Sequence, residues 1–476
     1  EVDEGPALFA ELDRLDPREI LFPEPCQDEP WVVASQAAGG VRWSPLTEAA
    51  FLRDAAVVDL RALFGVRDLS GFGVDEAGLG VRAAGAILVY LRISHVAALG
   101  HVRRLRPYSL DGYMVLDENT RRNLELFRTM AEGKRRGSLL GLLDHTVTGM
   151  GARRLRAFLS APLLDAPAIA ERHDAVSLLV DLPSLRDPLR ERLDRVHDIE
   201  RLNGRIASGR ATPKDLVALR RSLEQAPSID VLLDREDARG LLAFAPLPDL
   251  AALCRLIEDA IVDDPPASAK DGGVIRRGHD RELDELIGLS REGKGALARL
   301  ETEEKKRTGI GSLKVRYNRV FGYYIEVTKS NLGAVPDHYI RKQTLANAER
   351  YYTPELKEFE NKVLGAEERR GVLETELFGA LRDEVATHAR AIAELADRLA
   401  EIDALLSFAD CAVRHQYVRP TIDGTTVLRI EGGRHPVIER MNLGERFVPN
   451  DVALDPDGEQ LLIISGPNMA GKSTVM

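Results

Sequence analysis

One periodic stretch of the sequence, residues 373–409, reads LETELFGALRDEVATHARAIAELADRLAEIDALLSFA. Apolar side chains recur in it every three or four residues, from Leu373 to Leu405. This spacing places them on one face of an α-helix. Because the same pattern begins near Pro354 and runs to about Ala412, the sequence predicts one long helix, or two nearly collinear ones, across these residues.

A second helical pattern lies upstream, between Arg281 and Arg307. Two long helices that flank a short insertion are typical of antiparallel arms. The insertion changes period, because residues 313–318 and 323–328 alternate apolar and polar side chains as β-strands do. The sequence therefore predicts a β-hairpin at the tip of two helical arms, with Gly322 near its turn.

The insertion is also locally basic. The whole chain carries a net charge of −11, but between Lys305 and Arg350 ten Lys and Arg residues stand against three acids, an excess of 10 − 3 = 7. Local patches rather than total charge attract phosphates. Lys314, Arg316 and Asn318 fall on one face of the first predicted strand, which suits a polyanion backbone; the alternative, a solvated face of a surface hairpin, stays open.

Length and composition limit the possible domain organisation, metal sites and location of the protein. The length of 476 residues and the hydrophobic fraction of 44% predict about three or four domains. Cys26, Cys254 and Cys411 are far apart, and no CxxC or Cys/His spacing is recognised, which argues against disulfides and a structural zinc site. No apolar stretch approaches the roughly 20 residues that span a bilayer. We expect a soluble, cytoplasmic protein with no membrane partner.

The last residues of the sequence contain a phosphate-binding pattern. Gly466-x-x-x-x-Gly471-Lys472-Ser473 is a complete Walker A loop, and it follows the apolar run 461–464, which predicts a buried parallel strand. In such a loop the lysine reaches the β- and γ-phosphates, and the serine hydroxyl holds Mg²⁺. The sequence therefore predicts a site for ATP or ADP with Mg²⁺.

Several segments resemble the MutS family of DNA mismatch repair proteins. Residues 345–357, LANAERYYTPELK, together with residues 321–325, FGYYI, are similar to that family's clamp. Further similar segments occur in the family's order along about 360 residues, namely 116–125, 143–151, 271–275, 433–436 and 466–469.

The resemblance implies a multidomain, mostly α fold. It assigns the later portion of an α/β connector to residues 1–112 and core and lever helices to 113–302. A DNA clamp follows at 303–360, a returning lever helix at 361–417 and the start of a P-loop α/β ATPase domain at 418–476. By this resemblance the small β clamp lies at the tip of long lever arms.

The resemblance also implies site residues. Nucleotide contacts are expected from Phe447, which stacks on adenine in the family, and from the loop residues Gly466, Pro467, Asn468, Met469, Ala470, Gly471, Lys472, Ser473 and Thr474, of which Ser473 would hold Mg²⁺. Contacts to DNA phosphates are expected from Lys314, Arg316, Asn318, Arg319, Lys329, Arg341 and Lys342. His435 is not assigned a catalytic role, since no acid partner lies near it in the sequence.

For the complete protein the resemblance implies an ATP-dependent sliding clamp on double-stranded DNA. It implies a homodimer, a MutL-like repair protein that binds the connector, and a bacterial-type cytosol or nucleoid location. The family's mismatch-reading domain precedes the connector and is not expected in this chain. No Walker B acid follows the loop in this sequence, so no complete catalytic set is assigned, and we expect this chain not to hydrolyse ATP alone.

Other function classes stay open. A chromosome-organising or double-strand-break ATPase also couples a P-loop to long arms, but its Walker A motif precedes the arms, whereas here it follows them. A clamp-containing MutS paralogue that acts in recombination would carry the same segments. So would a DNA-binding scaffold module without ATPase activity.

Overall fold

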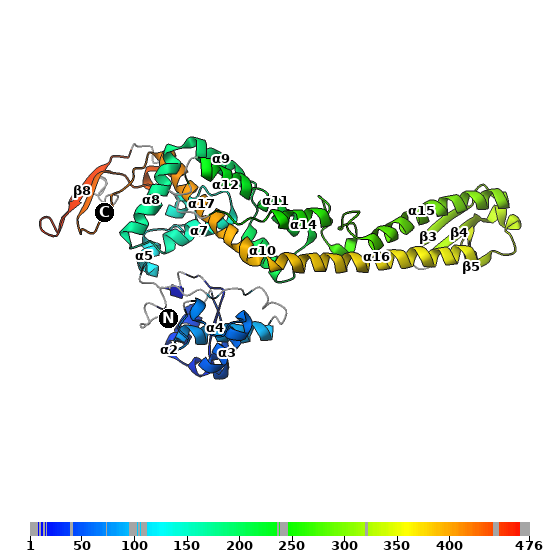
Figure 1. Ribbon diagram of the computed structural model, residues 1–476, viewed down its shortest axis with the longest axis horizontal. Helices are drawn as coiled ribbons and strands as arrows, with labels where there is room; N and C mark the ends of the chain where they lie inside the picture. Colours follow the sequence, from blue (N-terminus) through cyan, green and yellow to red (C-terminus); the bar gives the residue numbers. More distant parts are fainter. Residues whose placement is uncertain are drawn as a thin grey trace. The chain divides into compact units, whose positions relative to one another are not determined.

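The structure is a computed structural model of residues 1–476, shown in Figure 1. It describes residues 8, 11–12, 15, 17–38, 41–72, 74–94, 102, 105, 112–235, 238, 246–318, 322–440 and 447–466, without the side chains of 71 and 290–298. The chain divides into two compact units. One comprises Glu1–Gly209, Arg221–Leu250 and His388–Met476, and the other comprises Arg210–Arg220 and Ala251–Thr387.

The N-terminal part of the first unit is an α/β module. Strands β1 (Glu19–Pro23) and β2 (Arg42–Leu46) pair in parallel, and helix α2 (Pro30–Ala38) connects them. Helices α3 (Arg53–Phe64) and α4 (Leu79–Ser94) pack on each other around a buried apolar cluster. The parallel pair with its crossover helix confirms the α/β character predicted for this part of the chain.

Helix α17 (Ala389–His415) is the centre of the remaining first unit. Its predicted apolar face is buried, including Ile392, Leu395, Leu399 and Leu405. Helices α7 (Gly149–Ser160), α8 (Ala166–Asp181), α9 (Pro183–Leu193) and α10 (Ile199–Ala207) contact it. The other helices are α5 (Glu118–Asn123), α6 (Leu139–Leu143), α11 (Pro213–Leu223), which straddles the two units, and α12 (Ala226–Arg235).

The second unit contains α14 (Ala251–Ala260) and a pair of long helices, α15 (Arg281–Thr308) and α16 (Pro354–Thr387). The 28 and 34 residues of α15 and α16 correspond to about 42 and 51 Å. Thr353 caps α16, because its hydroxyl oxygen accepts the Leu356 N–H at 3.2 Å, and Pro354 suits the first helical position. The predicted long helix is thus two helices, since α16 ends at Thr387 and α17 begins at Ala389.

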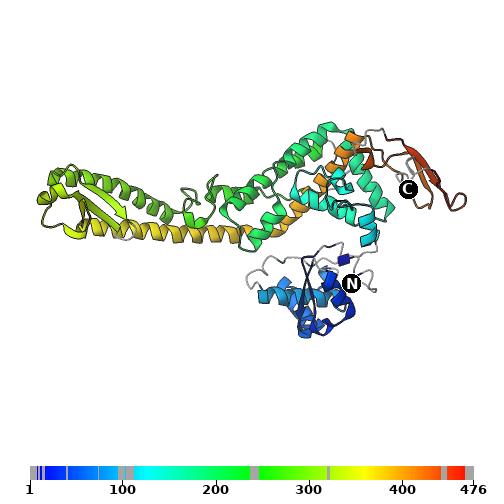
Figure 2. The same cartoon turned by 180° about the vertical axis from the view of Figure 1, so that it is seen from behind.

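A four-stranded antiparallel sheet lies between α15 and α16 at one end of the pair (Figure 1), and Figure 2 shows it from behind. Its strands are β3 (Lys314–Asn318), β4 (Gly322–Thr328), β5 (Ile340–Thr344) and β6 (Ala348–Tyr352), in the order β3-β4-β6-β5. The predicted hairpin is confirmed, and its turn, 319–321, lies outside the described residues. Helices α15 and α16 both run into the segment 303–360 that the sequence assigns to the clamp; the domain limits themselves stay predictions.

After residue 417 the described chain contains one antiparallel strand pair, β7 (Leu428–Gly433) and β8 (Asn450–Leu454). The sequence predicts a buried strand at 461–464, and this prediction is wrong for the structure: these residues form no strand, and Leu461 and Ile463 are 79% and 88% exposed. A buried parallel strand needs neighbouring strands, and the described residues that follow α17 provide only β7 and β8. Among the described residues, no helix has the length and apolar character to cross a membrane.

Candidate nucleic-acid interface

The register of the four-stranded sheet separates its two faces. Lys314 and Arg316 of β3 stand opposite Glu326 and Tyr324 of β4, and Glu326 stands opposite Arg350 of β6. Cross-strand partners share a face, so these side chains form what we call the outer face. The opposite face packs against the helices through Ile325, Val327 and Tyr351. The predicted alternation along β3 therefore does place basic side chains away from the core.

Carboxylates of the two long helices fix the sheet in place. Glu301 of α15 accepts the Val315 N–H at 3.0 Å, and Glu360 of α16 accepts the Tyr323 N–H at 2.8 Å. Glu304 of α15 accepts the buried Tyr339 hydroxyl at 2.5 Å, and burial raises the pKa of that tyrosine. Hydrogen bonds to ionised acceptors are stronger than neutral ones, so the sheet is held rigidly on its helices. The sequence pattern did not reveal these acids.

Ion pairs reduce the positive charge that the sequence predicts for this region. Two acids just before the counted window pair with basic residues inside it: Glu301 lies 2.6 Å from Lys305, and Glu304 lies 2.8 Å from Arg307. Within the window, Glu326 lies between two arginines, 3.4 Å from Arg350 and 3.9 Å from Arg316, and Glu349 lies 3.7 Å from Arg341. Glu326 and Glu349 are already in the count, whereas Glu301 and Glu304 are not, so including these two acids lowers the excess to 7 − 2 = 5.

The predicted DNA-binding residues occupy three different places. Lys314 and Arg316 lie on the outer face, both exposed, and Asn318 follows them on the same strand. Lys329 is exposed at the end of β4. Arg341, 65% exposed on the edge strand β5, is opposite Tyr351 and so belongs to the other face.

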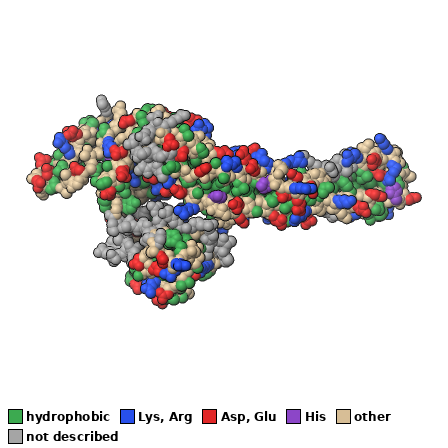
Figure 3. Space-filling model, in the orientation of Figure 1, with side chains coloured by type: hydrophobic (Ala, Val, Ile, Leu, Met, Phe, Trp, Pro, Cys, Tyr) green, Lys and Arg blue, Asp and Glu red, His purple; other side chains and the backbone are tan. Residues whose placement is uncertain are grey.

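Lys342 and Arg319 are the remaining predicted DNA-binding residues. The ammonium of Lys342 lies 5.3 Å from the centroid of the Tyr352 ring. Arg319 lies outside the described residues. Lys314 and Lys329 form no ion pair with any residue that the structure describes, which leaves their ammonium groups available to phosphates. Lys and Arg side chains on this part of the surface lie among Asp and Glu side chains (Figure 3).

Arg350 belongs to the outer face, although the sequence does not single it out as a contact residue. Its guanidinium stacks 4.3 Å from the centroid of the Tyr324 ring and donates to the Gln343 side chain at 2.8 Å. Stacking and pairing hold the group in one position. The alternation of residues 348–352 was the signal that could have placed it on this face.

The predicted nucleotide site lies almost entirely beyond the part of the chain that the structure describes. Gly466 is described, whereas Pro467 to Thr474, including the predicted Mg²⁺ ligand Ser473, are not. Phe447 is half-buried in an irregular segment before β8. The Nδ1 atom of His435 accepts the Ile438 N–H at 3.2 Å; that this residue has no catalytic role stays a prediction.

Comparison with known proteins identifies the family. The family model described as MutS domain II matches residues 1–103, and the model described as MutS domain III matches residues 119–409. The DNA mismatch repair protein MutS of Symbiobacterium thermophilum is 49% identical over 470 residues, which are 98% of this chain and 54% of that protein. That of Myxococcus xanthus is 49% identical over 479 residues, which are 99% of this chain and 54% of that protein.

A third relative, the DNA mismatch repair protein MutS of Salinibacter ruber, is 48% identical over 428 residues, which are 90% of this chain and 47% of that protein. The chain thus spans about half the length of the curated relatives that it matches. The matches to domains II and III coincide with the α/β module and with the helices that carry the four-stranded sheet. On this agreement of sequence and fold, the chain belongs to the MutS family.

Proposed function

We propose that this chain is part of a DNA mismatch repair protein and that its four-stranded sheet grips duplex DNA through the phosphates. The observation that carries the proposal is the outer face, where exposed Lys314 and Arg316 stand on a sheet anchored to two long helices. Lys329, exposed at the end of β4, is a further candidate contact outside that face. Ammonium and guanidinium groups bind phosphates without reading bases.

The name of these relatives, DNA mismatch repair protein, supports the choice of duplex DNA as the polyanion. In the complete protein the clamp would belong to an ATP-dependent sliding clamp that acts as a homodimer. A MutL-like repair protein would bind its connector. ATP or ADP with Mg²⁺ would occupy the loop 466–474, where Lys472 meets the phosphates and Ser473 the metal ion. The sequence pattern supports this assignment.

Long rigid helices can transmit a conformational change from the nucleotide site to the four-stranded sheet. A nucleotide changes the arrangement of the arms only if it binds two arrangements with different affinity. The carboxylate anchors at Glu301, Glu304 and Glu360 would make the sheet follow α15 and α16 as one body. We therefore propose that the sheet carries phosphate contacts and that the helices carry the nucleotide signal.

Equilibrium binding of this chain to matched and singly mismatched duplexes of equal length, across a salt series, tests the proposal. We expect equal affinities and a steep loss of binding as salt rises. Each phosphate contact contributes about 0.9 to the slope of log K against log salt, so Lys314→Ala combined with Lys329→Ala should lower the slope by about 1.8 units.

The control is Lys134→Ala, which removes one positive charge from an exposed lysine paired with Glu132 in the other unit. It should leave the slope unchanged. A double variant with the wild-type slope would remove these two lysines from the interface. A clear preference for the mismatched duplex would show that mismatch recognition resides in this chain, against the expectation from the sequence.

A further inference from the structure

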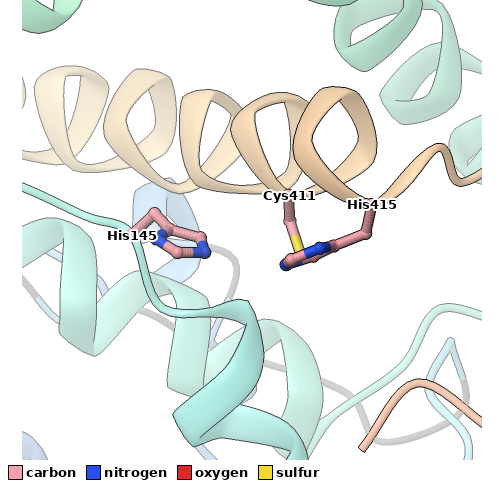
Figure 4. Close-up of side chains that lie close together, drawn as sticks. All are labelled: His145, Cys411 and His415. Atoms are coloured by element: carbon pink, nitrogen blue, oxygen red, sulfur yellow. The ribbon is translucent and has the colours of Figure 1, made fainter. Parts of the chain in front are cut away.

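Three side chains with metal-binding atoms converge in the first unit. Cys411 and His415 lie one turn apart on α17, and His145 lies in the segment between α6 and α7. One ligand atom from each lies within 4.8 Å of the other two. Figure 4 shows that Cys411 and His415 project from the same side of the helix and that the His145 ring lies beside them.

The position of His145 is fixed by the same helix. Ser407, fully buried and one turn before Cys411, accepts the His145 N–H at 2.7 Å and donates to the Leu143 carbonyl at 2.7 Å. Residues 407, 411 and 415 therefore form one row along α17, since positions four apart share a helix face. The row both anchors the His145 backbone and provides two of the three donor atoms.

Two nitrogen atoms of this cluster have no partner among the described residues. They are Nε2 of His145 and Nδ1 of His415, and both are buried. Buried polar atoms in folded proteins are nearly always paired, so an unpaired one calls for an explanation such as an ion.

We propose that His145, Cys411 and His415 bind a Zn²⁺ ion. Two imidazoles and a thiolate are ligands that Zn²⁺ takes at about 2.0–2.1 and 2.3 Å. Ligand atoms of such a tetrahedral site are roughly 3.4–3.7 Å apart, so small side-chain rotations would close the 4.8 Å cluster. On binding, the Cys411 thiol loses its proton to solvent and the thiolate coordinates the ion.

The three protein ligands leave the fourth position of a tetrahedral site to a water molecule. Of the three residues, Cys411 alone lines a neighbouring pocket of 520 Å³. The bound ion would tie the end of α17 to the segment that leads into α7.

Without a recognised Cys/His spacing, a zinc site was not predicted from the sequence, but the structure brings two histidines and a cysteine together. Cys411 and His415 are four residues apart on a strongly periodic helix. Two residues at this spacing lie on the same face of a helix and can bind one metal ion together. Only the fold brings His145 to them.

The test is metal titration of the whole chain after reduction and chelator treatment. We expect one Zn²⁺ per chain. Co²⁺ in the same site should show the absorption of tetrahedral coordination and a thiolate-to-metal charge-transfer band. Cys411→Ala should abolish that band, and Cys411→Ala, His145→Gln and His415→Gln should each weaken Zn²⁺ binding by at least ~100-fold. Zn²⁺ should raise the Tm of the wild-type chain and not that of the variants.

Matched controls are Cys254→Ala and His388→Gln, which change the same residue types outside the cluster and should leave binding unchanged. Because Cys411 is buried, circular dichroism of every variant comes first, and His415→Gln provides the test if Cys411→Ala does not fold. Absence of stoichiometric Zn²⁺ binding would overturn the proposal. So would Zn²⁺ affinity that survives in folded Cys411→Ala or His415→Gln.

Discussion

Replacing Glu374 by alanine should detach the loop at residues 272–275 from helix α16. Glu374 is a fully buried carboxylate, 0% exposed. It accepts three successive backbone N–H groups, from Gly273 at 2.7 Å, Val274 at 2.9 Å and Ile275 at 3.3 Å. Gly272 and Gly273 have φ of +71° and +84°, which lets the loop turn its N–H groups toward the carboxylate.

The magnitude follows from the donors that would lose their acceptor. Leaving a buried N–H unpaired costs about 1–3 kcal/mol, so the two buried donors, Val274 and Ile275, give a loss of stability of at least about 2 kcal/mol. Glu374→Gln keeps one oxygen acceptor and loses only the charge and the contact with Arg370 at 3.5 Å. We expect it to cost about 1–2 kcal/mol.

Hydrogen exchange of the amides of residues 273–275 is the assay, because it reports this loop separately in a chain of several domains. A loss of about 2 kcal/mol corresponds to roughly 30-fold faster exchange. The matched control is Glu376→Ala, two residues further along α16, where the carboxylate is 59% exposed and only 3.9 Å from Arg369. The reasoning is refuted if Glu374→Ala exchanges no faster than Glu376→Ala.

Three further outcomes test the packing and the electrostatics. A Cβ atom at Gly151 would lie 2.1 Å from an Asp403 carboxylate oxygen. Gly151→Ala should therefore destabilise the first unit by about 1–3 kcal/mol, which its urea midpoint measures. Unchanged stability would contradict this packing. A Cβ at Gly85 would lie 2.3 Å from the nearest side-chain carbon of α3, so Gly85→Val should lower the Tm of the α/β module, whereas Gly80→Val, with open space, should not. The hydrogen bond from Arg61 holds the pKa of Glu76 below its ordinary value of 4.5, so the folded state releases this proton more readily and gains stability above pH 4.5. The urea midpoints of wild type and Glu76→Gln should therefore differ at neutral pH and converge as pH falls below 4.5. A difference that stays constant down to about pH 3 would argue against the ion pair.

The helices and the hairpin could be predicted because their signals are short-range. The burial of Ile392, Leu395 and Leu399 follows directly from their spacing. The alternation of residues 313–318 likewise predicts which side chains of β3 face the core. The failed prediction is the strand at 461–464, whose formation depends on partner strands and so on more than its own residues.

The candidate interface was predictable only in part. Spacing indicated that Lys314 and Arg316 share a face, but it could not show that Glu326 lies between Arg316 and Arg350. Counting charges along the chain treats sequence neighbours as spatial neighbours. Electrostatic energy depends on distance in space, so the surviving positive charge is known only after folding brings the acids to their partners.

The sequence by itself determined the periodicities, the Walker A pattern and the family of this protein. Each of these features depends on residues that are close together along the chain. Over such short distances, helix and strand geometry determine which side chains lie on the same face of an element. Only the tertiary structure decided that Asp403 accepts the Val147 and Thr148 N–H groups, that Glu374 is buried beneath its loop, and that His145 meets Cys411. These contacts join segments far apart in the chain, and no local periodicity encodes which distant segment packs against a given helix face.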